Sequence, residues 1–228
     1  MKELDSILEQ YKNPEKAELL RRFFKTGKGE YGEGDVFLGI TVPDQRKIAK
    51  QFLDFGFDDI QVLLNSEIHE KRLIGLLILV DKFKDHPTEV YDFYLKNSKK
   101  INNWDLVDLS CHKIVGEFLL TRDRSILYKL ARSNNLWEKR IAIVSTFAFI
   151  RENRFNDCLK ISEMLLGDDH DLIHKAVGWM LREVGKKNLA ILERFLKKNY
   201  KQMPRTMLRY SIEKFPEELR KKYLKGEI

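Results

Sequence analysis

Apolar residues recur at spacings of three and four along most of the chain, the pattern of helices with one buried face. It is clearest in EKRLIGLLILVDKF (70–83), LWEKRIAIVSTFAFI (136–150) and LIHKAVGWMLREV (172–184). No convincing run alternates apolar and polar residues at period two, so the pattern does not favour a β-sheet. The sequence therefore predicts an all-α protein.

Short polar clusters separate the predicted helices, and their lengths suit helix–helix connections. These clusters are KNP (12–14), KDHP (84–87), KNSKK (96–100), RSNN (132–135), GDDHD (167–171) and KKN (197–199). Pro14 and Pro43 are expected to open helices, because the fixed φ and missing N–H of proline suit the first helical turn. The run SNN at 133–135 offers capping side chains for the helix that follows it.

A basic residue occupies the same helical register in the three segments. Arg72, Arg140 and Lys175 each precede an apolar run, and they lie 68 and 35 residues apart. This spacing indicates a repeat of about 35 residues, with one copy between the first two. That copy is NNWDLVDLSCHKIVG (102–116), which aligns if Asp108 takes the place of the cation.

Repeats of this length are typical of α-solenoids of the HEAT kind, in which the inner helices of successive pairs line one concave surface. We expect a single HEAT-like repeat domain over residues 1–228, with the aligned residues in a row along a concave, basic inner surface. Lys71, Lys139 and Arg182 extend this basic row.

The composition suits a folded intracellular protein. The 228 residues are 43% hydrophobic and 34% charged with only 12 glycines and 5 prolines, which excludes collagen-like and low-complexity classes. Two cysteines without CxxC spacing indicate a reducing compartment. No signal peptide is recognisable and no apolar run reaches the ~20 residues that a membrane span needs. We expect a soluble cytoplasmic protein.

The net charge of +7 favours a polyanionic partner such as nucleic acid. A row of cations along a groove would bind phosphates with salt-sensitive, sequence-independent affinity. Taken singly, each cation is as well explained as a solvated surface charge. Their shared register is what favours phosphate binding.

Two tryptophans lie one helical turn from members of the row. Trp104 precedes Asp108 by four residues, and Trp179 follows Lys175 by four. Tryptophan is more often a core residue, and we interpret Trp137 in that way. Trp104 differs because polar residues surround it. An aromatic face beside a carboxylate suits a cation or developing positive charge.

Other motifs are weaker. The glycines of GKGEYGEGD (27–35) match GxGxxG, but a helix is predicted before them where a dinucleotide site needs a strand. His170 and His174 lie one turn apart without a Glu or Cys to complete a ligand set. Cys111 and His112 are adjacent, so their side chains diverge by about 100° on a helix and cannot pair for nucleophilic catalysis. We expect no metal and no cofactor.

Five segments resemble the DNA alkylation repair glycosylases of the AlkD type. They are NPEKAELLRRFF (13–24), FLGITVPDQRKIAK (37–50), NNWDLVD (102–108), NLWEKRIAI (135–143) and IHKAVGWMLRE (173–183). The resemblance implies a HEAT-like fold. It also implies removal of N3- and N7-alkylated purines, such as 3-methyladenine and 7-methylguanine, from duplex DNA without flipping the damaged base into a pocket.

The resemblance also implies roles for individual residues. Trp104, Asp108 and Trp179 match the trio that embraces the sugar and backbone at the lesion, and Arg140 matches the arginine beside the catalytic carboxylate and the DNA phosphates. Phe23 stands where family members can carry a tyrosine, so it keeps the ring and loses the hydroxyl. The expected DNA-binding residues are Phe23, Lys71, Arg72, Lys139, Lys175 and Arg182.

Three functional hypotheses follow. The first is a DNA glycosylase of base excision repair, a monomer that acts on duplex DNA containing alkylated purines in the cytoplasm and at the nucleoid. Its Asp108 carboxylate would stabilise the positive charge that develops on the sugar. The second is a non-catalytic HEAT-like module that binds branched or damaged DNA. The third is a protein-binding solenoid, whose affinity would change little with salt.

Overall fold

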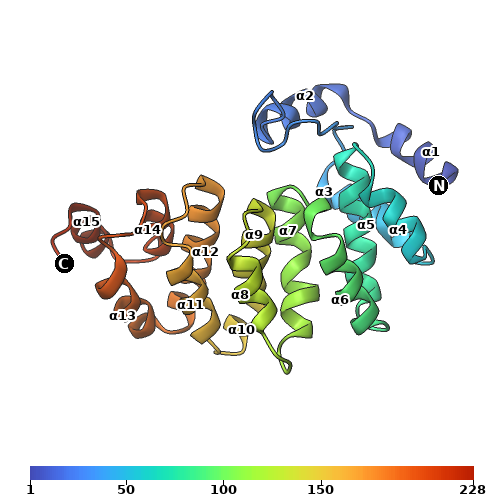
Figure 1. Cartoon of the computed structure of the whole chain (residues 1–228). Coiled ribbons are helices and arrows are strands. Elements are labelled where there is room, and N and C mark those ends of the chain that lie inside the picture. Colours follow the sequence, from blue (N-terminus) through green and yellow to red (C-terminus); the bar gives the residue numbers. More distant parts are fainter. The chain divides into compact units, whose positions relative to one another are not determined.

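The computed structural model describes all 228 residues, and it is helical throughout (Figure 1). The one extended pairing is an isolated parallel bridge between Val36 and Ile68. The prediction of an all-α, solenoid-like fold is therefore confirmed. No helix is long and apolar enough to cross a membrane.

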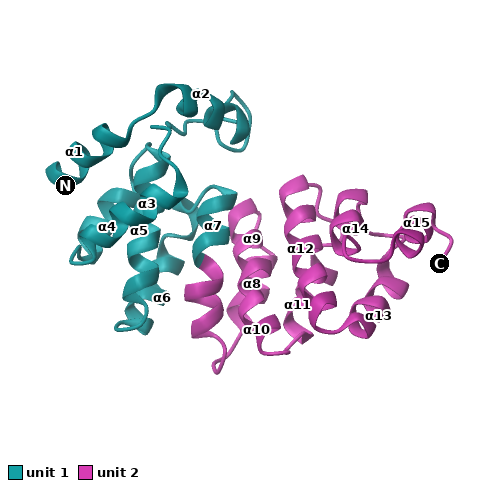
Figure 2. Ribbon diagram, turned by 180° about the vertical axis from the view of Figure 1, so that it is seen from behind, with its two compact units in different colours: residues 1–110 teal, residues 111–228 magenta.

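The chain divides into two compact units, residues 1–110 and 111–228, which Figure 2 shows in different colours. The prediction of one repeat domain over residues 1–228 stays a prediction, and so does that of a concave, basic inner surface.

Unit 1 holds the first helices of the chain. They are α1 (Lys2–Tyr11), α2 (Pro14–Phe23), α3 (Val42–Ala49), η1 (Lys50–Phe52), α4 (Phe57–Leu64), α5 (His69–Lys82), α6 (Pro87–Lys96), η2 (Ser98–Lys100) and most of α7 (Trp104–Cys111). Pro14 opens α2 as predicted, and the Asn13 side chain accepts a hydrogen bond from the Lys16 backbone N–H over 2.9 Å. Pro43 lies in the first turn of α3, which Thr41 caps. Each of these starts satisfies an N–H that the helix itself leaves unpaired.

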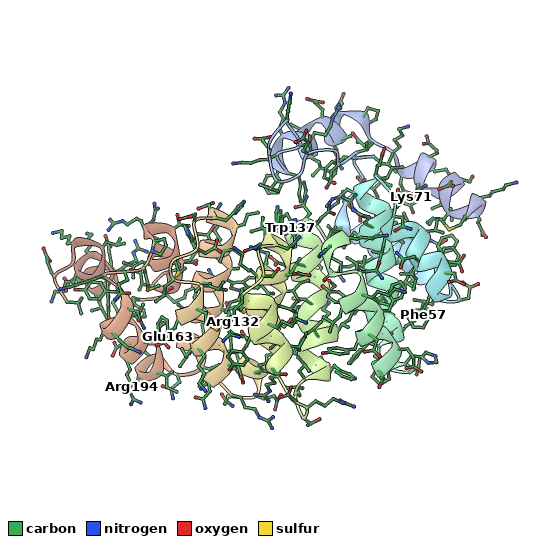
Figure 3. All side chains as sticks on the ribbon, in the orientation of Figure 1. Phe57, Lys71, Arg132, Trp137, Glu163 and Arg194 are labelled. Atoms are coloured by element: carbon green, nitrogen blue, oxygen red, sulfur yellow. The ribbon has the colours of Figure 1, made fainter.

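Unit 2 holds the remaining helices. They are η3 (His112–Gly116), α8 (Ser125–Ala131), α9 (Leu136–Ser145), α10 (Phe147–Arg151), α11 (Asn156–Met164), α12 (Asp171–Lys187), α13 (Leu189–Asn199), α14 (Arg205–Ser211) and α15 (Glu217–Lys225). Asn135 caps α9 as predicted, since its Oδ1 accepts from the backbone N–H groups of Trp137 and Glu138 at 2.9 and 3.1 Å. Trp137, labelled in Figure 3, is buried, which confirms that it is a core residue.

The four aligned residues occupy equivalent helical positions. Asp108, Arg140 and Lys175 are each the fifth residue of their helices, α7, α9 and α12, and Arg72 is the fourth of α5. The register read from the sequence is therefore preserved to within one residue.

Buried apolar residues form the core of each unit. In α5 the run 73–79 is buried on every side of the helix, and in α9 the run 141–144 is buried in the same way. Fully burying each such Leu, Ile or Val contributes roughly 1.5–3 kcal/mol. Cys158 is one of these residues, and burial raises the pKa of its thiol to about 12. It fills the helix interior, as predicted.

The glycine-rich segment 27–35 folds as turns after α2, and no strand precedes it. Gly29 and Gly34 have φ of +79° and +87°, which glycine adopts at little cost. The surroundings are those of a helix-to-loop connection rather than of a dinucleotide site.

Candidate functional site

A cleft of about 560 Å³ lies in unit 1 between α2, the loop that follows it, and the N-terminal turns of α5 and α7. Most of the side chains along it are apolar. Leu19 and Phe23 of α2 are 65% and 63% exposed, and both line this cleft. Large exposed apolar side chains gathered in one concave place mark a binding surface more often than they mark chance.

Four rings form a stack along one wall of the cleft. Trp104 lies nearly parallel to Phe24, with 5.1 Å between ring centroids and 10° between planes. Phe24 stacks on Phe37 at 5.0 Å, and Phe37 stacks on His69 at 4.6 Å. Phe23 meets Trp104 edge to face at 5.8 Å. Because neighbouring rings restrict one another, Trp104 presents a preset flat face to the cleft.

Trp104 and Asp108 lie one turn apart on α7, and both line the cleft. Both are half-buried. The structure thus places a carboxylate beside an indole along an aromatic wall, as the sequence predicts for this pair. In such a setting a carboxylate acts on a nearby positive charge more strongly than it does in water.

A buried ion cluster lies beneath this turn of α7. His69 Nε2 and Asp105 Oδ2 are 2.8 Å apart, and His69 Nδ1 and Asp35 Oδ2 are 3.1 Å apart. His69 is only 2% exposed. Burial by itself lowers the pKa of His69, but the Asp105 and Asp35 carboxylates outweigh it and raise that pKa to about 9. The imidazole is therefore protonated at neutral pH, and both of its nitrogens donate.

Arg72 completes the cluster. Its Nη2 lies 2.6 Å from Asp35 Oδ1, and its Nη1 donates to the Ser66 carbonyl over 2.9 Å. Asn103 Nδ2 donates to Asp35 Oδ2 over 3.2 Å. Burial raises the pKa of Asp35, but hydrogen bonds and charge from His69 and Arg72 overcome this and hold it below its usual range. Two cations therefore balance two carboxylates.

This placement corrects one prediction. We expected Arg72 among the DNA-binding residues, but the structure buries it in the ion cluster, where no phosphate meets its guanidinium. The reason is the buried Asp35 carboxylate, which lies 37 positions earlier in the chain and needs a compensating charge.

Glu70 fixes the loop that links α2 to α3. Its buried carboxylate accepts hydrogen bonds from the backbone N–H groups of Leu38, Gly39 and Ile40 at 2.8–3.3 Å. The Leu38 carbonyl in turn accepts from the Asn13 N–H over 2.9 Å at the start of α2. The outer wall of the cleft is therefore held to α5 through this loop.

The remaining cations predicted for the basic row each have an acidic partner. Lys71 (Figure 3) lies 2.7 Å from Asp5, Lys139 pairs with Asp168, Lys175 lies 2.7 Å from Asp171, and Arg182 pairs with Glu213. Exposed ion pairs are worth only about 0–1 kcal/mol. A DNA phosphate can therefore compete for these side chains, although the row carries less net charge than the sequence indicates.

Arg140 and Trp179 belong to unit 2. Arg140 is buried, and its Nη1 donates to the Leu172 carbonyl over 2.5 Å, which links α9 to the first turn of α12. Trp179 is half-buried on α12, and its ring lies 6.1 Å from that of Phe147. The catalytic roles of these two residues stay predictions.

The histidine pair has structural partners. His170 Nδ1 accepts from the Leu172 N–H over 3.1 Å and so caps α12, while His174 Nε2 bonds to the Asp168 carbonyl. No group of three or more His, Cys, Asp or Glu side chains is placed to hold a metal ion. His112 packs edge to face on Phe147, and burial lowers its pKa to about 4.

Sequence reasoning missed the buried polar residues beneath the cleft. Asp35, His69, Glu70 and Asp105 are far apart in the chain, and only Asp105 was noticed, as a polar neighbour of Trp104. A run of charged residues such as HEK at the start of an apolar helix reads as a solvated helix end. No local signal distinguishes the buried members.

Comparison with known proteins agrees with this arrangement. The sequence profile of the family described as "DNA alkylation repair enzyme" matches residues 4–215. A solved structure from Enterococcus faecalis, described as a predicted DNA alkylation repair enzyme, is similar in fold with a TM-score of 0.71 and 18% identity. The match covers 90% of this chain and 97% of that one. A search of curated proteins finds no match. The family match spans nearly the whole chain, and the chain therefore belongs to the DNA alkylation repair enzyme family.

Proposed function

We propose that this protein is a DNA glycosylase that hydrolyses the N-glycosidic bond of cationic N3- and N7-alkylated purines, such as 3-methyladenine and 7-methylguanine, in duplex DNA. The observation that supports the proposal is the placement of Asp108 and Trp104 one turn apart along one aromatic cleft. Membership of the alkylation repair family supplies the substrate, DNA, and the kind of damage.

The chemistry needs few groups. An alkylated purine already carries positive charge, so it leaves as a neutral base and takes with it the electron pair of the bond to the sugar C1′. The sugar becomes an oxocarbenium ion, water adds to C1′, and a proton is released. No general acid is required, and the enzyme acts by stabilising the charge on the sugar.

Asp108 supplies that stabilisation in this proposal. Its carboxylate attracts the positive charge on the sugar and orients the attacking water. Removing one preorganised electrostatic group of this kind costs on the order of a hundredfold or more in rate. Because the opposing charge exists only near the transition state, the loss falls on the rate of base release and not on DNA affinity.

Trp104 offers the sugar a flat aromatic face. The ring quadrupole favours positive charge, and the indole excludes bulk water from the carboxylate beside it. The wall next to Asp108 is aromatic and aliphatic, so it suits ring contacts better than hydrogen bonds to a base edge. We therefore propose that the damaged base is not flipped into a recognition pocket, in contrast to glycosylases that read an extruded base.

We assign the remaining predicted residues in keeping with the family resemblance. Arg140 and Trp179 act in catalysis from unit 2. The proposed DNA-binding residues are Phe23, Lys71, Lys139, Lys175 and Arg182, without Arg72.

Incubation with methylated duplex DNA, followed by chromatography of the released bases, tests the proposal. We expect 3-methyladenine or 7-methylguanine in the soluble fraction and no release of unmodified purines. A protein that binds the methylated duplex at full affinity and releases no base is a non-catalytic DNA-binding module instead.

A further inference from the structure

A second cavity, of about 750 Å³, lies within unit 2 between α12, α14 and α15. Charged side chains dominate its lining. Four cations and two carboxylates meet there: Lys175, Arg205, Arg209, Arg220, Asp171 and Glu213. The cavity thus carries two more positive than negative charges.

Both carboxylates are already paired. Asp171 lies 2.7 Å from Lys175 Nζ, and Glu213 is bound by Arg182 and lies 3.4 Å from Lys214 Nζ. Hydrogen bonds and charge from these partners outweigh desolvation and hold the pKa values of both carboxyls below their usual range. Neither acid is therefore available to neutralise the other cations of the cavity.

Two guanidiniums supply the excess charge. The side chains of Arg209 on α14 and Arg220 on α15 line the cavity and make no hydrogen bond or ion pair within the protein. The third arginine, Arg205, donates to the Leu224 carbonyl and so ties α14 to α15. Two unpaired guanidiniums at one concave site are a receptor for an anion, because the planar fork of arginine matches the oxygens of a phosphate.

Close packing sets the spacing of the cavity walls. α12 and α14 approach each other at Gly178, where a Cβ would lie 2.5 Å from Tyr210 Cβ and 2.6 Å from the Met207 carbonyl oxygen. Tyr223 holds α15 in place through edge-to-face contacts with Phe215 at 5.7 Å and Tyr200 at 5.5 Å. The helices that carry Arg209 and Arg220 are therefore positioned before any ligand arrives.

We propose that this cavity binds one phosphodiester of the DNA backbone, with Arg209 and Arg220 as its ligands. The proposal rests on the proposed function only for the identity of the anion, which is DNA. Sequence reasoning found Lys175 here and missed the two arginines. Arg220 lies beyond residue 215, where the family match ends, so the resemblance does not predict this site.

The test is the affinity of the full chain for a short undamaged duplex, measured by fluorescence anisotropy between about 50 and 200 mM salt. We expect the Arg209→Ala/Arg220→Ala double variant to bind about tenfold more weakly at the lower salt concentrations. The slope of log affinity against log salt should become shallower by about one, the contribution of one phosphate.

A matched control removes two exposed arginines of unit 2 that do not line the cavity. Arg132 follows α8 and Arg194 lies on α13, and both are labelled in Figure 3. The Arg132→Ala/Arg194→Ala variant changes the net charge equally, so we expect it to keep wild-type affinity and slope. Equal losses in the two double variants would show a general charge effect and overturn the proposal, as would wild-type behaviour of the cavity variant.

Two further arms separate the remaining readings. The Arg209→Lys/Arg220→Lys variant keeps the charge and loses the planar fork, so we expect the slope of wild type with reduced affinity. Inorganic phosphate should raise the melting temperature no more than sodium chloride of equal ionic strength. A saturable stabilisation by phosphate that the double alanine variant loses, with DNA binding unchanged, would identify a free-anion site and contradict the proposal. These readouts use undamaged DNA, so they do not depend on whether base release occurs.

Discussion

Asp105 Oδ2 lies 2.8 Å from His69 Nε2, so a buried ion pair joins the first turn of α7 to the first turn of α5. Asp105 directly follows Trp104 and precedes Asp108 by three residues. The turn that carries the proposed chemistry is therefore anchored by a group that does not itself need to touch DNA. Such support is what holds a reacting geometry to within a fraction of an ångström.

Replacing His69 with glutamine is expected to destabilise the protein by about 3–5 kcal/mol, because the Asp105 and Asp35 carboxylates lose the cation between them. Urea unfolding at neutral pH measures this loss. His86, an exposed histidine at the start of α6, provides the matched control, and His86→Gln should leave the free energy of unfolding unchanged. Equal stability of the two variants would show that the buried cluster contributes nothing.

The pH dependence of stability has a defined sign at His69. Its pKa is about 9 in the folded protein and 6.5 ordinarily, so its stabilisation is fully present below pH 6.5 and is lost as the pH rises through 9. The Asp35 pKa is lowered by folding, so its contribution is present above pH 3.8 and is lost as the pH falls through the folded value. In His69→Gln the decline in stability between pH 6.5 and 9 should flatten. A decline as steep as that of the wild type would assign it to other groups.

Gly39→Ala is expected to disturb the outer wall of the cleft. Gly39 has φ of +85°, and a Cβ there would lie 2.1 Å from the Asn13 carbonyl oxygen and 2.7 Å from the Ala17 nitrogen. Gly34 has nearly the same φ, +87°, with no atom within 4 Å of the position of its Cβ. Gly34→Ala should therefore cost only the roughly 1–2 kcal/mol of the left-handed backbone.

The close contact at Gly39 should add about 1–3 kcal/mol to that cost. Thermal unfolding of the two alanine variants gives the difference directly. Identical melting temperatures would mean that α2 and the loop separate without penalty, and that the wall of the cleft is not fixed by this contact.

Phe23→Ala tests whether the exposed ring at the cleft contacts DNA. Phe23 is 63% exposed, so its removal should change the free energy of unfolding by no more than about 0.5–1 kcal/mol while DNA affinity falls severalfold. Phe23→Tyr keeps the ring and should keep the affinity. Val62 on α4, 54% exposed and outside the cleft, serves as the control. A duplex affinity of Phe23→Ala no lower than that of Val62→Ala would remove Phe23 from the interface.

The fold follows from local signals in the chain. The caps at Asn13 and Asn135, the prolines that open α2 and α3, and the spacing of apolar residues each act within one or two turns of helix. The relation between Trp104 and Asp108 is of the same local kind, since residues four apart share a helix face. These features were predictable for that reason.

The electrostatics of the site depend on distant residues. Lys139 pairs with Asp168, 29 positions away, and His69 pairs with Asp35 and Asp105, 34 and 36 positions away. Periodicity shows which face of a helix is polar but does not show which acid from another helix reaches it. The basic row was therefore predicted with its cations and without their partners, and the buried cluster was not predicted at all.

The most direct test of the account compares base release by wild type, Asp108→Asn and Asp108→Ala. Chromatography of the bases freed from methylated duplex DNA under single-turnover conditions gives the rate, and anisotropy on the same duplex gives the affinity. The account predicts rapid release of 3-methyladenine or 7-methylguanine by the wild type. It predicts a loss of at least about a hundredfold in both variants, with binding nearly unchanged. Release by Asp108→Ala at the wild-type rate would contradict it.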